Sequence, residues 1–220
     1  MQTRVIPSSG HALPVIGCGT WLGFDVGRNP LEIAQRGKVL DTLFDVGGRV
    51  IDSSPMYGSA EEVVGELLGR RTKREQAFVA TKVWTTGKRA GIEQMERSMR
   101  LLQCKHIDLM QVHNLVDWRT HLPVLREWKA AGRFSYIGIT HYTESGYGEL
   151  EQVMRAEPLD FVQFNYSASN REAERRLLPL AAERGIAVLV NLPFGGGKLL
   201  KSLRTKPLPA WAGDIGCDSW

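Results

Sequence analysis

The segment Val50-Ile-Asp-Ser-Ser-Pro-Met-Tyr-Gly58 joins the end of a buried strand to a polar loop. Its first two residues close a short apolar run after a Gly-Gly pair, which is typical of a buried strand. Asp52 then stands at the carboxyl end of this strand, and Tyr57 follows on a loop favoured by the proline and the last glycine. We expect the carboxylate and the phenol to converge on one point.

Two further titratable residues end apolar runs downstream. Lys82 closes Phe78-Val-Ala-Thr-Lys82, and His113 closes Ile107-Asp-Leu-Met-Gln-Val-His113. Four polar residues therefore come from three successive strand-to-loop junctions. Because a barrel of parallel strands gathers its chemistry at the carboxyl ends of its strands, this pattern predicts an active site there.

Strand and helix patterns alternate along the chain with a repeat of about 25–30 residues, the size of a βα unit. The strands are expected at 15–19, 49–52, 77–82, 107–113, 134–140, 159–165 and 186–191. The helices between them are expected at 31–46, 59–68, 92–102, 122–131, 145–156 and 169–185. The segments Ser59-Ala-Glu-Glu62 and Ser169-Asn-Arg-Glu172 match capping boxes that open two of these helices.

These runs are apolar on both faces, as the strands of a covered parallel sheet must be. We therefore predict an α/β fold of the (β/α)8 TIM-barrel type with about seven βα units, since no eighth strand and helix follow in the sequence. Residues 2–16 are predicted to form an N-terminal β-hairpin. The chain, 1–220, is expected to be one domain that is incomplete at its C-terminus. An open, doubly wound sheet is the alternative fold.

The composition is that of an ordinary globular protein, with 43% hydrophobic and 24% charged residues among 220. No apolar run approaches the roughly 20 residues of a membrane helix, and the N-terminus lacks the apolar region of a secretory signal. The three cysteines have no short spacing, which argues against a disulfide framework and a zinc site. We expect a cytoplasmic protein without a metal and without a membrane partner.

Positive charge is concentrated near the end of the chain. The net charge is +4, and the segment 171–206 alone holds eight Lys and Arg against three Glu. This is either a solvated surface or the place of an anionic ligand such as a cofactor phosphate. Nucleic acid is not expected as a partner, because the basic residues are not interleaved with aromatic ones.

The four polar residues suit carbonyl reduction by hydride transfer. A carbonyl oxygen that gains charge needs a proton donor, and the pKa of a free tyrosine, about 10, is high for this task. We expect Lys82 to lower the pKa of Tyr57 and Asp52 to hold Lys82 in place. His113 is expected to orient the carbonyl group, while a cofactor carries the hydride.

At this point the sequence resembles the aldo-keto reductase superfamily over essentially its whole length. The resemblance is carried by Gly17-Cys-Gly-Thr-Trp21, Asp52-Ser-Ser-Pro-Met-Tyr-Gly58, Ala80-Thr-Lys82, Asp108-Leu-Met-Gln-Val-His113 and Gly132-Arg-Phe-Ser-Tyr-Ile-Gly-Ile-Thr140. It implies a (β/α)8 barrel that reduces small aldehydes or ketones with NADPH, and Asp52, Tyr57, Lys82 and His113 as the catalytic tetrad.

The resemblance also implies where cofactor and substrate bind. Trp21 and Trp84 would form apolar walls around the substrate, although both are also compatible with core packing. The cofactor would contact Gly19, Thr20, Thr140, His141, Gln163, Asn191, Phe194, Gly195, Gly196 and Gly197. The last four would cradle the pyrophosphate, although three glycines in a row are also typical of a simple flexible loop.

Three departures from the family pattern stand out. Thr140-His141 replaces a usual Ser-Asn pair, and Asn191 stands where an aromatic residue often stacks on the nicotinamide. The last strand and helix, with the loop that grips the adenosine 2′-phosphate, have no counterpart, so the sequence does not distinguish NADPH from NADH. The alternative function is a cofactor-binding or structural homologue with weak or no turnover. Self-association through the open barrel edge is also expected.

Overall fold

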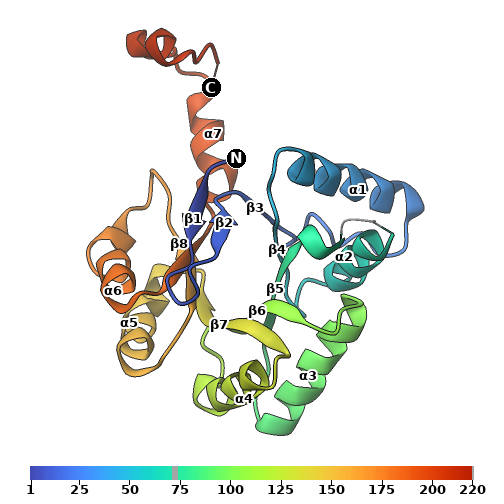
Figure 1. Cartoon of the computed structure of the whole chain (residues 1–220). Coiled ribbons are helices and arrows are strands. Elements are labelled where there is room, and N and C mark those ends of the chain that lie inside the picture. The colour runs from blue at the N-terminus through green and yellow to red at the C-terminus, as the bar shows by residue number, and fades with distance from the viewer. Residues whose placement is uncertain (71–73, 220) are drawn as a thin grey trace.

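The computed structural model describes residues 1–70 and 74–219. Its main feature is a parallel sheet of seven strands that lie side by side in chain order (Figure 1). The strands are β3 (Gly17–Gly19), β4 (Val50–Asp52), β5 (Phe78–Val83), β6 (Ile107–His113), β7 (Phe134–His141), β8 (Phe161–Asn165) and β9 (Ala187–Asn191). A doubly wound sheet does not keep its strands in chain order, so that alternative is wrong.

Helices follow the strands and cover the outer face of the curved sheet (Figure 1). They are α1 (Pro30–Asp45), α2 (Ala60–Gly69), α3 (Lys88–Leu101), α4 (Trp118–Ala130), α5 (Tyr147–Ala156), α6 (Leu177–Arg184) and α7 (Lys198–Leu203). Short 3-10 segments also occur: η1 (Arg74–Gln76), η2 (Glu144–Gly146), η3 (Glu172–Glu174), η4 (Gly195–Gly197) and η5 (Ala210–Ile215). This alternation confirms the predicted barrel type with about seven βα units.

The N-terminal hairpin also forms as predicted, from β1 (Thr3–Val5) and β2 (Ala12–Pro14). It covers the amino-terminal end of the sheet, because Ile6 joins the apolar cluster on the sheet's inner face. The hydroxyl group of Tyr136 on β7 lies 2.8 Å from Oγ of Ser9 and 2.9 Å from Nδ1 of His11. The hairpin therefore closes the end of the sheet opposite the predicted chemistry.

The inner face of the sheet is apolar in its lower layer. Side chains that alternate along the strands point to the same face, so residues two apart stack in layers. The buried members of this inner cluster are Ile6, Val50, Phe78, Ala80, Leu109, Tyr136 and Phe161. A larger cluster lies between the outer face and the helices. The residues two positions after several inner members are those that build the site.

Both predicted capping boxes are wrong. Ser59 precedes α2, but its hydroxyl donates to Asp25 at 2.8 Å and accepts from the amide of Gly27. Ser169 does not open α6, which begins only at Leu177; its hydroxyl lies 3.2 Å from that of Ser167. In both cases the serine hydroxyl is hydrogen-bonded to groups in loops and not to the first amides of a helix.

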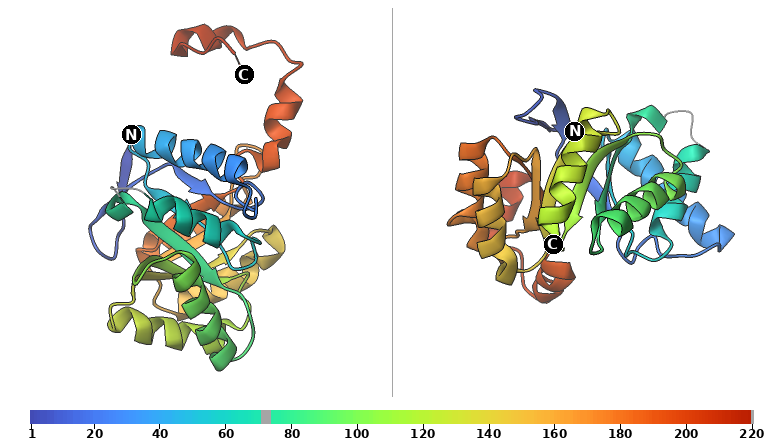
Figure 2. Two further views of the ribbon diagram at one scale, coloured as in Figure 1. Left: turned by 90° about the vertical axis from the view of Figure 1, so that its right-hand side faces the viewer. Right: turned by 90° about the horizontal axis from the view of Figure 1, so that it is seen from below.

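The two edges of the sheet are β3 and β9, each of which pairs on one side. After β9 the chain continues through η4 and α7 into a segment that extends away from the helices and the sheet (Figure 2). Cys18, Cys104 and Cys217 are all free. No helix within 1–70 and 74–219 has the length and apolar character to cross a membrane.

Candidate active site

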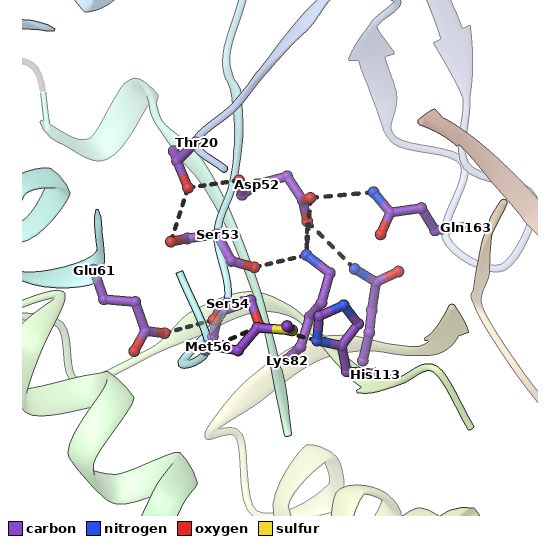
Figure 3. Close-up of polar contacts among 11 residues, drawn as sticks. Thr20, Asp52, Ser53, Ser54, Met56, Glu61, Lys82, His113 and Gln163 are labelled. Atoms are coloured by element: carbon purple, nitrogen blue, oxygen red, sulfur yellow. Dashed lines mark hydrogen bonds and ion pairs between the residues drawn. The ribbon is translucent and has the colours of Figure 1, made fainter. Parts of the chain in front are cut away.

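The candidate site lies where β4 to β8 end, one layer above the apolar inner cluster. Asp52 is the last residue of β4, Lys82 lies one residue before the end of β5, and His113 ends β6. The parallel register places Lys82 beside Gln111 and His113 beside Thr140. The sequence-predicted carboxylate, ammonium and imidazole therefore share one end of the barrel (Figure 3).

Asp52 and Lys82 form a buried ion pair. The ammonium of Lys82 lies 2.8 Å from each carboxylate oxygen of Asp52 and donates to the carbonyl of Ser53 at 2.6 Å. The Lys82 side chain is 1% exposed, whereas that of Asp52 is 16% exposed. A buried ammonium is tolerated only where its charge is matched and its protons are hydrogen-bonded, and both conditions are met here.

Two glutamine amides complete the surroundings of Asp52. Nε2 of Gln163 donates to one carboxylate oxygen at 3.2 Å, and Nε2 of Gln111 approaches the other at 3.5 Å. Both glutamines are buried. Oε1 of Gln111 is buried without a partner among the described residues. Asp52 is therefore the centre of a polar layer across the barrel, held by groups from three other strands.

Tyr57 lies on the loop after β4, with its ring against this layer. Nζ of Lys82 is 5.3 Å from the ring centroid, and the ring of His113 meets it edge-on at 6.0 Å. The phenol group has no hydrogen-bond partner in the described part of the chain. Burial first, and the charge of Asp52 second, raise the pKa of Tyr57. The prediction that Lys82 lowers this pKa is wrong for this state, because Asp52 matches the charge of Lys82 and itself faces the phenol.

His113 is held as a neutral imidazole. Its Nδ1 lies 3.0 Å from the hydroxyl oxygen of Ser54, and its ring lies 6.3 Å from that of Trp84. Burial, and then the charges of Lys82 and His141, lower the pKa of His113 to about 3. A neutral ring carries one N–H and one bare nitrogen, so His113 can either donate or accept a hydrogen bond at Nε2.

The predicted nicotinamide contacts differ in how accessible they are. Thr20 is buried, and its hydroxyl donates to the carbonyl of Asp52 and contacts Oγ of Ser53, so it braces β4. Gly19 has open space where a side chain would stand. Thr140 is buried at the end of β7, and the ring of His141 is held at Nδ1 by Thr143.

At the far side of the site, Asn191 ends β9 beside Asn165. Oδ1 of Asn191 is buried and lacks a partner among the described residues. The next turn holds Phe194, which is 55% exposed, and three glycines with positive φ. At Gly196 and Gly197 a side chain would meet nothing within 4 Å. This turn therefore presents bare backbone to the solvent.

The two predicted substrate walls also differ. Trp84 follows β5, is 40% exposed and faces His113. Its backbone N–H donates to Oε1 of Gln94, and its carbonyl accepts from Nε2 of the same side chain. Trp21 is 58% exposed, and no ring contact connects it with the tetrad within the described residues. Trp84 thus lies beside a tetrad residue, whereas no such contact of Trp21 is seen among the described residues.

Sequence reasoning missed Gln111, Ser53 and Ser54. The signal for Gln111 was its position two residues before His113, since alternate residues of a strand share a face. Ser53 and Ser54 follow Asp52 directly and are almost completely buried. Buried hydroxyl groups next to a charged residue usually have hydrogen-bond partners, which was a weaker signal.

Comparisons with known proteins agree on one family. The model of the "Aldo/keto reductase family" matches residues 15–210. Aldo-keto reductase YhdN of Bacillus subtilis is 30% identical over 223 residues, which cover 93% of this chain and 64% of that protein. Methylglyoxal reductase YeaE of Escherichia coli is 29% identical over 212 residues, covering 92% and 72%. The chain thus spans less than two thirds of the first relative and somewhat more of the second.

Solved structures give the same result. An aldo/keto reductase from Klebsiella pneumoniae, crystallised with NADP and acetate, has a TM-score of 0.80 at 25% identity, covering 98% of this chain and 77% of that one. Another from Klebsiella pneumoniae, in complex with NADPH, has a TM-score of 0.77 at 26% identity, covering 94% and 74%. Because the family model spans most of the sequence and these folds superpose, the chain belongs to the aldo/keto reductase family.

Proposed function

We propose that this chain is an oxidoreductase that reduces small aldehydes or ketones to alcohols with NADPH, with Tyr57 as the general acid. The observation that carries the proposal is the convergence of Tyr57, the Asp52–Lys82 ion pair and a neutral His113 at the carboxyl ends of the strands. Its family membership and its relatives' activities agree with this chemistry.

Tyr57 is suited to deliver the proton. Its phenol group is free of protein partners in the described part of the chain, and its raised pKa keeps the proton in place until a substrate oxygen gains negative charge. Once the proton has moved to that oxygen, the ammonium of Lys82 lies beside the phenolate, and the charge of Asp52 offsets much of its attraction. Asp52 holds the ammonium in place through contacts of 2.8 Å from both of its carboxylate oxygens.

His113 is suited to orient the carbonyl group, since a neutral imidazole can bind it without adding a charge. Trp84, beside His113, offers an apolar wall to the carbon skeleton of the substrate. We assign Trp21 to the same pocket on the strength of its exposure and its position after β3. The proposed substrate is a small carbonyl compound such as methylglyoxal, which the name of one relative specifies.

The residues present fit a nicotinamide nucleotide. Oδ1 of Asn191 is a buried acceptor without a hydrogen-bond donor among the described residues. The carboxamide of a nicotinamide would supply such a donor. Gln163 and Thr140 lie beside each other in the register, and His141 follows. Gly19 and the turn Phe194–Gly197 leave room for close approach of a ligand to the backbone. Bound NADPH would supply the hydride.

The experiment measures oxidation of NADPH, and in parallel of NADH, by the 220-residue chain with methylglyoxal. We expect aldehyde-dependent oxidation that falls at least ~10²-fold in Tyr57→Phe. Tyr136→Phe is the control, because it removes a phenol at the opposite end of the barrel. Quenching of tryptophan fluorescence by NADPH without oxidation of any aldehyde would favour the non-catalytic homologue instead.

We also infer that copies of this chain associate through the open edges of the sheet. β3 and β9 each have one side that pairs with no other strand within residues 1–70 and 74–219, and Val190 on β9 and Leu192 after it are exposed. Unpaired strand edges with apolar side chains favour pairing with another strand. The cytoplasmic location remains a prediction, supported by three free cysteines.

A further inference from the structure

Among the described residues, Ser54 is the one whose side chain is hydrogen-bonded to the imidazole of His113 from another strand-to-loop junction. Its Oγ lies 3.0 Å from Nδ1, and both side chains are buried (Figure 3). Ser54 comes two residues after Asp52, on the loop that also carries Tyr57. A single hydroxyl therefore connects the loop of the proposed acid to the residue proposed to orient the carbonyl.

The direction of this hydrogen bond follows from counting donors and acceptors. A hydroxyl group has one proton to donate, and a neutral imidazole has one N–H and one bare nitrogen. Oγ of Ser54 is already approached by the backbone amide of Met56 at 3.5 Å, the outer limit of a hydrogen bond. Nδ1 of His113 is the only acceptor within reach of the Ser54 hydroxyl among residues 1–70 and 74–219.

If Nδ1 carried the ring proton, it would donate to Ser54, and the buried hydroxyl proton would have no acceptor in that part of the chain. A buried polar group without a partner costs about 1–3 kcal/mol. If the hydroxyl donates instead, Ser54 and Nδ1 are both satisfied. The ring proton then lies on Nε2, the nitrogen on the side of the ring away from Ser54.

We propose that Ser54 is a positioning residue whose hydroxyl donates to Nδ1 of His113 and thereby keeps the ring proton on Nε2, ready to be donated to a carbonyl oxygen. The inference rests on the proposed function, because that function places the substrate oxygen beside His113. The opposite tautomer would turn a bare nitrogen toward the oxygen, and two electron-rich atoms would repel each other.

The depressed pKa of His113 agrees with this assignment, since the ring then holds a single proton whose place Ser54 decides. The other groups around the ring do not compete for it. Tyr57 and Trp84 face it with their ring systems, and Lys82 has its hydrogen bonds on Asp52 and Ser53. His141 is held at Nδ1 by Thr143.

The first test is nitrogen-detected NMR of the 15N-labelled, unmodified chain without cofactor. The five histidines give few signals, and His113→Gln assigns those of His113 by their loss. We expect Nε2 of His113 to be protonated and Nδ1 to be bare. Protonation at Nδ1 in the unmodified chain would overturn the proposal, whether or not the chain is an active reductase.

The second test compares variants. In Ser54→Ala we expect a mixture of the two tautomers, at least a ~10-fold lower kcat with methylglyoxal and an unchanged affinity for NADPH. Ser54→Thr keeps a hydroxyl and should restore the Nε2 tautomer. The control is Ser98→Ala, which removes a buried hydroxyl that donates to Glu61, and should leave the His113 signals unchanged.

These readouts separate the two ideas. Suppose that the Nε2 tautomer is lost in Ser54→Ala but the unmodified chain reduces no aldehyde. This result would contradict the proposed function and leave Ser54 as the residue that determines the tautomer of His113. Unchanged His113 signals in a folded Ser54→Ala would contradict the role of Ser54 and leave the proposed function standing. Equal loss of kcat in Ser54→Thr would also count against the hydroxyl.

Discussion

The ammonium of Lys82 contacts both carboxylate oxygens of Asp52 at 2.8 Å, although Lys82 is almost completely removed from solvent. Loss of either partner should therefore leave a poorly solvated charge. Asp52→Asn strands a fully buried cation, for which a cost of about 3–5 kcal/mol is expected. Lys82→Met strands a partly exposed carboxylate that keeps the amides of Gln163 and Gln111, so it should cost less.

A double-mutant cycle checks this order. We expect Asp52→Asn with Lys82→Met to be more stable than the sum of the single losses implies, by roughly 0.5–3 kcal/mol, the usual coupling of contacting residues. Urea unfolding followed by circular dichroism gives the three free energies of unfolding. Strictly additive losses would mean that the two groups do not act as a pair.

The phenol of Tyr57 should be dispensable for folding and needed for turnover. Because its hydroxyl has no protein partner in the described part of the chain, Tyr57→Phe should change the free energy of unfolding by less than about 0.5 kcal/mol. Absorbance titration against this variant should place the pKa of Tyr57 above its ordinary value. Asp52→Asn should lower that pKa, since it removes a negative charge and leaves Lys82 uncompensated. A Tyr57 that titrates like a free tyrosine would contradict this description.

His113 should make the chain less stable in acid. Its pKa is about 6.5 in the unfolded chain and about 3 in the folded one. Between these values the unfolded state binds the additional proton, so the free energy of unfolding falls as the pH falls. The slope from this residue should approach about 1.4 kcal/mol per pH unit.

The matched comparison is His113→Gln, which lacks the titrating ring. The difference between its pH profile and that of the unmodified chain removes the contributions of other groups, such as Glu61 and Asp108, whose pKa values are raised by burial. Urea unfolding at several pH values between ~6.5 and ~3 supplies both profiles. Parallel profiles would show that His113 titrates normally.

The sequence predicted the barrel and the position of Asp52, Lys82 and His113, because apolar runs that end in a titratable residue recur along the chain at the spacing of βα units. It also predicted that Asp52 and Lys82 pair. The direction of the Tyr57 pKa was wrong, because the sequence shows which charges are near but not which of them is already matched. Burial of the phenol, the larger cause, depends on packing that no local pattern shows.

The helix starts were predicted less well. Ser59 and Ser169 each stand three residues before a glutamate, as in a capping box. Their hydroxyls instead contact side chains of loops, that of Asp25 in the first case. Helix α4 begins at Trp118, four residues before the start expected at Leu122, although Pro123 lies within it. Pro123 is the sixth residue of α4 and lies beyond its first turn, so the helix forms there although one backbone hydrogen bond is missing. Where these helices begin depends on tertiary contacts, which local sequence patterns do not show.

The glycine turn after β9 allows a controlled test of cofactor binding. Gly196 has a φ of +64° and open space around it. Gly196→Val therefore strains the backbone whether or not the turn contacts a cofactor. Gly216→Val is the matched control, because Gly216 has a φ of +67° and equally open surroundings but no proposed cofactor contact. We expect Gly196→Val alone to weaken NADPH binding, by a kcal/mol or more, in fluorescence titrations. Equal affinities in the two variants would favour a simple flexible loop.

The unpaired edge of β9 should govern self-association. Its neighbour β8 is buried along its whole length, whereas β9 is only partly buried and Val190 is 41% exposed. A lysine on an edge strand opposes pairing with another strand, so Val190→Lys should shift the chain toward the monomer in sedimentation velocity runs. Val46→Lys is the control, because Val46 is equally apolar and 54% exposed but follows α1, away from the sheet edge. If both variants shift association alike, general surface hydrophobicity is the cause. If neither does, the edges do not carry the contact, and the exposed strand is tolerated because it is short, since three to five residues offer too few backbone groups to hold a second chain.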